Sequence, residues 1–168
     1  MSPSDVIFGT FVVIAVIGAV AMLVRSPRPL GVSRLVEVLL LWTLVALVGL
    51  SGLIGGLFHL LTPEMAARSI GWEPSPFQRE VGFGDVGIGV LGLLSARLRG
   101  LFWWATGIWS FIFFGGASVG HFIEQQVAGN FAPGNAGLVF WIDVFVAVAM
   151  LVLLPLYQLT RPRPTPAA

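Results

Sequence analysis

Both histidines of this sequence and four of its acidic residues stand in or beside its apolar stretches and could do chemistry together: His59, Glu80, Asp85, His121, Glu124 and Asp143. The segment SVGHFIEQQVAGN places His121 and Glu124 three residues apart, which is about one turn of a helix. Imidazole and carboxylate groups can relay protons, bind cations or ligate metals, and two imidazoles can ligate haem. Placing such a group in lipid costs at least about 2.5 kcal/mol, so each is a candidate functional residue.

The composition predicts a membrane protein. Of the 168 residues, 57% are hydrophobic and 10% are charged, whereas about a quarter are charged in typical soluble domains. The basic residues are all arginines and are scattered, which excludes the clustered basic face of a nucleic-acid-binding protein. The chain has no cysteine, so disulfides, thiolate ligands and iron–sulfur clusters are also excluded. The lipid bilayer is the expected partner.

The apolar stretches predict an all-α polytopic bundle, because roughly 20 apolar residues cross the hydrocarbon core as one helix. We expect a single membrane domain with a four-helix core and an additional N-terminal helix, and spans at residues 6–24, 35–61, 80–96, 101–123 and 138–159. The N-terminus lacks the basic region of a signal peptide, so the first span is expected to be retained. Residues 160–168 form a tail.

Two loops have their own signals. In the amphipathic loop 62–79, Thr62 followed by Pro63 predicts the start of a short helix, which Pro74 and Pro76 are expected to end. The loop GNFAPGNAG has no charge and is rich in turn-forming residues, so it is expected to fold back compactly.

The arginines predict the orientation. Most of them fall in the segments RSPRPLGVSR, SARLRG and RPRPTPAA, which share one side of a five-span topology. Short cytoplasmic loops are enriched in arginine, so the tail is predicted to be cytoplasmic and the N-terminus outside. Arg68 and Arg79 then lie outside, and the six ionisable residues gather near the outer membrane surface, with Asp85 about 7 to 8 Å deeper than Glu80.

Small residues at helical spacing predict the packed faces of the helices. Gly49, Gly52 and Gly56 lead to His59 in steps of three and four residues, so His59 is expected to point into the bundle. A similar face of 101–123 leads to His121, and Gly82, Gly89 and Gly92 lie near the face of Asp85. Most aromatic residues of 101–123, including Trp103, Trp104 and Trp109, are expected to face lipid.

Three interpretations remain open. The favoured one is a non-enzymatic protein with an outward-facing polar pocket, formed by all six residues, for a proton, ion or small ligand. The second is an oxidoreductase subunit with a metal held by His59, His121 and Glu124, or a haem between the histidines. The third is a structural or assembly subunit in which GASVG and GDVGIG make oligomer contacts and the histidines only support packing.

The segments GLFHLLTPEMAARSIGWEPSPFQREVGFGDVGIGVLG and GHFIEQQVAGNFAPGNAG resemble a bacterial family of small membrane proteins of unknown function. The resemblance covers about Leu35 to Leu159, and the chain is also distantly similar to DoxX-type four-helix membrane proteins, in which a helix ends in a histidine near a proline. The resemblance implies a bacterial inner-membrane location and a membrane-complex partner, such as an oxidoreductase or a quinone-linked protein. It implies no catalytic residue.

Overall fold

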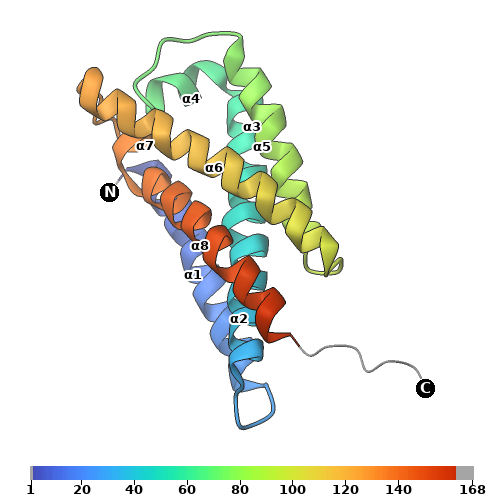
Figure 1. The fold of residues 1–168 in the computed structure, drawn as a ribbon. Helices are drawn as coiled ribbons and strands as arrows, with labels where there is room; N and C mark the ends of the chain where they lie inside the picture. Colours follow the sequence, from blue (N-terminus) through green and yellow to red (C-terminus); the bar gives the residue numbers. More distant parts are fainter. Residues whose placement is uncertain (1, 162–168) are drawn as a thin grey trace.

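The computed structural model describes residues 2–161, which form a bundle of helices without a strand in that range (Figure 1). The predicted all-α class is therefore confirmed for these residues. Beyond Arg161 the predicted tail lies outside the described residues. The elements in chain order are α1 (Pro3–Val24), α2 (Val32–Trp42), the π-helical η1 (Thr43–Leu50), α3 (Ser51–Leu61), α4 (Pro63–Ser69), α5 (Phe77–Leu94), α6 (Leu101–Val127), α7 (Pro133–Ala136) and α8 (Leu138–Thr160).

Among residues 2–161, four helical segments are long and apolar enough to cross a membrane: Pro3–Val24, Val32–Leu61, Leu101–Val127 and Pro133–Thr160. The second runs continuously through α2, η1 and α3, and the fourth joins α7 to α8. The remaining predicted span, 80–96, corresponds to α5. This helix has 18 residues and carries Arg79, Glu80 and Asp85, so it is more polar than the other four.

Glycines bring α3 and α5 into backbone contact. A Cβ atom added to Gly56 would lie 2.7 Å from the Gly82 carbonyl oxygen, and one added to Gly52 would lie 3.0 Å from that of Asp85. Gly49 and Gly92 meet in the same way one turn further along. The predicted glycine faces are therefore packing faces, and they pack against each other. This contact fixes the position of α5 and thereby of Asp85.

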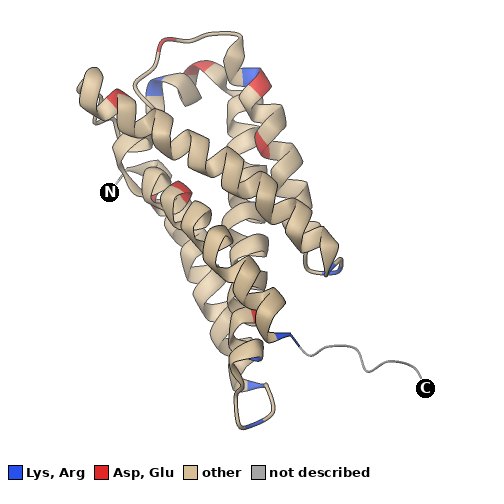
Figure 2. Cartoon of the chain, viewed as in Figure 1, with Lys and Arg blue, Asp and Glu red and all other residues tan. Residues whose placement is uncertain are grey.

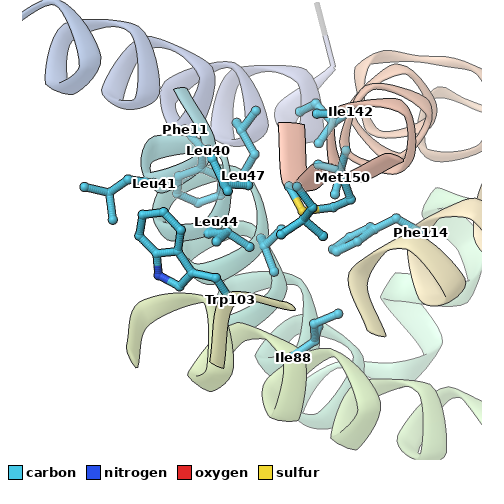
Figure 3. Close-up of a cluster of buried hydrophobic side chains, with 14 residues drawn as sticks. Phe11, Leu40, Leu41, Leu44, Leu47, Ile88, Trp103, Phe114, Ile142 and Met150 are labelled. Atoms are coloured by element: carbon cyan, nitrogen blue, oxygen red, sulfur yellow. The ribbon is translucent and has the colours of Figure 1, made fainter. Parts of the chain in front are cut away.

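A hydrophobic core joins α6 and α8 to the long second segment (Figure 3). Leu44, Trp103 and Met150 are almost fully buried in it. The prediction that Trp103 faces lipid is wrong, because its ring packs inside the bundle and its indole N–H donates to the Ser95 carbonyl at 2.8 Å. Trp109 is exposed, as expected.

The short helix α4 begins at Pro63, as predicted, but it ends earlier than expected. Its end is set by Gly71, whose φ of 73° lies in the left-handed region. The Trp72 N–H donates to the Ala67 carbonyl and the Gly71 N–H donates to that of Arg68, which is the Schellman pattern. Pro74 and Pro76 follow only after the helix has ended. The glycine turn places Trp72 beside the bundle.

Charged residues gather at the two ends of the helices, and few lie between them (Figure 2). At the end where α2 begins, the Glu37 carboxylate accepts hydrogen bonds from Arg34 and Arg99. Two of the arginine-rich segments therefore meet at one end of the bundle. Asp85 lies in the middle of α5, and Asp143 lies in the second turn of α8.

Candidate functional site

A cavity of about 340 Å³ lies between α3, α5, α6 and α8. Four of the six predicted residues line it, one from each of these helices: His59, Asp85, His121 and Asp143. Glu80 is exposed and Glu124 is half-buried, and neither lines the cavity. The structure therefore brings four of the six residues to one cavity, while Glu80 and Glu124 lie nearer to the ends of their helices.

The most buried polar groups of the cavity are His121 and Asp143. Only 8% of His121 and 6% of Asp143 is exposed. The His121 Nε2 atom lies 3.8 Å from Asp143 Oδ2, which is ion-pair range but too long for a hydrogen bond. No described residue donates a hydrogen bond to the Asp143 carboxylate, so its oxygen atoms are available to a ligand.

Asn135 fixes the orientation of the His121 ring. Its amide Nδ2 donates to the Asn130 carbonyl at 2.7 Å and, more weakly, to the His121 carbonyl at 3.4 Å. The amide oxygen Oδ1 must then face His121 Nδ1, 2.6 Å away, and this ring nitrogen carries the hydrogen. In the neutral ring, Nε2 is consequently an acceptor that faces Asp143.

The loop between α6 and α8 supplies Asn135, which is completely buried. Gln125 Nε2 donates to the Asn135 carbonyl at 2.9 Å, and Asn130 Nδ2 donates to the Ile70 carbonyl at 2.8 Å. These bonds join this loop to the α4 segment across the same end of the bundle. The compact loop expected from the sequence is therefore confirmed, but the sequence reasoning did not identify Asn135 as a partner of His121. The sequence feature that could have indicated Asn135 is the uncharged segment GNFAPGNAG after His121, which contains two asparagines.

His59 has a similar amide partner on α5. Its Nδ1 lies 2.7 Å from Gln78 Oε1, and Gln78 is only 3% exposed. Sequence reasoning also missed Gln78, because it stands next to the charged pair Arg79 and Glu80 and reads as part of a solvated loop. Both cavity histidines are thus held by uncharged amides. Asp85, by contrast, receives no hydrogen bond from another described side chain.

Aromatic side chains form much of the remaining wall, namely those of Phe8, Trp72, Phe77, Phe113 and Phe114. The Trp72 ring lies 6.1 Å from the His121 ring, centroid to centroid, and covers it from the α4 side. Gly116 and Gly120 of α6 also border the cavity, and a Cβ atom at either would meet nothing within 4 Å. The wall is therefore apolar and aromatic apart from the histidines, the aspartates, Gln78 and Ser51.

The residues predicted as metal ligands, His59, His121 and Glu124, do not form a metal site. Within residues 2–161, no three histidine, aspartate or glutamate side chains are placed to hold one ion. The reason is local: both histidines are bonded to amides, and Glu124 is outside the cavity. The proposed oligomer faces are also partly occupied, because Gly84 and Gly89 of GDVGIG contact Phe113 and Leu53 within the chain.

The chain matches the family of unknown function DUF6790 over residues 5–163. The match includes α1, whereas the resemblance noted in the sequence began only at Leu35. No curated protein and no solved structure matches the chain. The likeness to DoxX-type proteins gains no support from these comparisons and stays a prediction.

Proposed function

The chain belongs to this family of unknown function, so we propose its function from the geometry of the cavity. We propose that it is a single-domain protein of the bacterial inner membrane with five spans, an outer N-terminus and a cytoplasmic C-terminus. Its cavity opens to the outside and binds a proton, an ion or a small ligand. The observation that carries this proposal is the buried pair of His121 and Asp143, which faces a cavity in an otherwise apolar bundle.

The fifth span is α5. Its 18 residues extend about 27 Å, close to the thickness of the hydrocarbon core. Its polar residues Arg79 and Glu80 lie in its first turn, where they reach the membrane surface, and Asp85 faces the cavity instead of lipid. The backbone contact of α5 with α3 supports the same depth for both helices.

The orientation follows from the two ends of the bundle. The end at which Glu37 bonds Arg34 and Arg99 is rich in arginine and is cytoplasmic under the positive-inside rule. The opposite end carries the α4 segment and the Asn135 loop, and the cavity lies beneath it. A ligand therefore reaches the cavity from outside.

The His121–Asp143 pair differs from a pair that only stabilises packing. A histidine and an aspartate that served packing alone would have their polar atoms satisfied within the protein. Here no described residue donates a hydrogen bond to the Asp143 carboxylate, whose Oδ2 lies 3.8 Å from His121 Nε2, and the carboxylate borders open volume. Its remaining oxygen lone pairs are available to a proton, a cation or the donor groups of a ligand.

Thermal unfolding in detergent micelles tests this function. The purified protein and the Asp143→Asn variant are heated with a panel of probes: sodium, potassium and calcium chloride, sodium phosphate, choline chloride and glucose. We expect at least one probe to raise the melting temperature of the wild-type protein and to have a smaller effect on Asp143→Asn. If no probe stabilises the wild-type protein, or if each stabilises both proteins equally, the proposed binding of an ion or small ligand is wrong.

A further inference from the structure

We propose that the ligand of this cavity is a small organic ammonium ion, held by Asp85 and Asp143 between aromatic rings. This inference rests on the proposed function and specifies its ligand class. It follows from three properties of the cavity wall: the sign of its charge, the chemistry of its apolar surface and its volume.

The charge of the wall favours a cation. Asp85 and Asp143 are its acidic residues, and no arginine lines it. The two histidines are the other titratable groups that face the cavity, and each has Nδ1 engaged by a neutral amide. Neither amide partner brings a positive charge. Apart from His121, no described residue is placed to balance the charge of these carboxylates. A cationic ligand would balance it.

The apolar surface favours an organic cation. Phe8, Phe77, Phe113 and Phe114 line the cavity together with Trp72. Aromatic faces attract cations, and rings arranged around a cavity are a recurring way to bind substituted ammonium groups. The same rings cannot replace the water shell of a metal ion.

The arrangement of oxygen atoms disfavours inorganic cations. Calcium takes six to eight oxygen ligands, and magnesium demands near-octahedral coordination. In residues 2–161, no three metal-binding side chains are placed around one point. An ammonium group with carbon substituents needs one or two carboxylates and otherwise contacts apolar surface, which is the combination found here.

The volume limits the size of the ligand. Small-molecule pockets range from about 300 to 1,000 Å³, so a cavity of about 340 Å³ is near the lower end. A group such as tetramethylammonium or choline fits this range. Large polycyclic compounds do not.

Isothermal titration calorimetry on the full chain in detergent tests the inference. The probes are choline chloride and its neutral analogue 3,3-dimethylbutan-1-ol, in which carbon replaces nitrogen, with sodium chloride as the ionic-strength control. We expect choline to bind and the neutral analogue to bind at least about tenfold more weakly, since the analogue loses both the Coulombic attraction to the carboxylates and the cation–π attraction to the rings, together worth a factor of ten or more.

Variants locate the binding to the cavity. Asp143→Asn is expected to weaken choline binding about tenfold or more, and Phe113→Leu about two- to thirtyfold. Asp85→Asn serves as a second carboxylate variant, because no described side chain depends on Asp85 for a hydrogen bond. The matched controls are Glu80→Gln and Phe83→Leu, whose side chains are exposed and lie outside the cavity.

The outcomes separate the two proposals. Equal binding of choline and its neutral analogue, or equal effects of the cavity and control variants, overturns the ammonium inference. If only inorganic ions or phosphate from the earlier panel stabilise the protein, the cavity binds a ligand but the ammonium class is wrong. If neither choline nor any other probe acts on the wild-type protein, both the inference and the proposed function fail.

Discussion

Replacing Gly89 by alanine tests the backbone contact that holds α5 against α3. The added methyl group would lie 2.9 Å from both the Gly52 carbonyl carbon and the Leu53 Cα atom, with the Leu53 nitrogen closer still. These are backbone atoms, so relief requires the helices to move apart. Gly87 offers a matched control on the same helix, because a Cβ atom there would meet nothing within 4 Å.

The expected difference can be worked from these contacts. Overpacking a tight interface costs about 1 to 3 kcal/mol, and a contact with immovable backbone belongs at the upper end. At an unobstructed helical position, exchange of glycine for alanine stabilises by about 0.4 to 1 kcal/mol. Gly89→Ala is therefore expected to unfold more easily than Gly87→Ala by about 1.5 to 4 kcal/mol.

The free energy of unfolding of both variants is measured by equilibrium unfolding in mixed micelles. Circular dichroism follows the helicity as the fraction of sodium dodecyl sulfate rises. Equal stabilities, or a more stable Gly89→Ala variant, would refute the close packing of α3 and α5. The position of Asp85 in the cavity wall would then lose its support.

Three further predictions concern the α4 and Asn135 segments and the opposite end of the bundle. Asn135→Ala removes the hydrogen bond to His121 Nδ1 and leaves buried polar groups unpaired. The same unfolding titration should therefore show that the free energy of unfolding falls by about 2 to 4 kcal/mol. A fall below about half a kcal/mol would contradict the assigned hydrogen-bond network. Gly71→Ala imposes a left-handed conformation on a residue with a Cβ atom, which should cost about 1 to 2 kcal/mol of folding free energy. Release of Trp72 should also shift the tryptophan fluorescence maximum to longer wavelength. An unchanged spectrum and stability would count against the Schellman turn. Glu37→Gln weakens a partly exposed ion pair and should cost less than about 1 kcal/mol; a larger loss would mean that this end is more tightly built than the contacts indicate.

The features that were predicted from the sequence depend on local spacing. Gly49, Gly52 and Gly56 recur at helical intervals, so their common face follows from the geometry of one helix, and His59 follows from the same count. The helix start at Pro63 is likewise encoded by two adjacent residues. Such signals need no knowledge of what lies opposite.

The features that were missed depend on contacts between segments. Gln78 and Asn135 are uncharged and stand in stretches that read as loops, yet each is buried because a histidine from another helix bonds its amide oxygen. Glu124 was grouped with His121 because it lies one turn away. A separation of three residues leaves the two side chains about 60° apart around the helix, enough to put one in the cavity wall and the other outside it.

Thiol labelling in intact cells tests the outward-facing cavity most directly, because the wild-type chain has no cysteine. Three single variants are treated with a membrane-impermeant, positively charged methanethiosulfonate reagent: Gly120→Cys in the cavity wall, Arg68→Cys on α4 and Leu98→Cys at the arginine-rich end. We predict labelling of Gly120→Cys and Arg68→Cys in intact cells, and of Leu98→Cys only after the membrane is permeabilised. Labelling of Leu98→Cys in intact cells, or no labelling of Gly120→Cys while Arg68→Cys reacts, would contradict an outward-facing cavity.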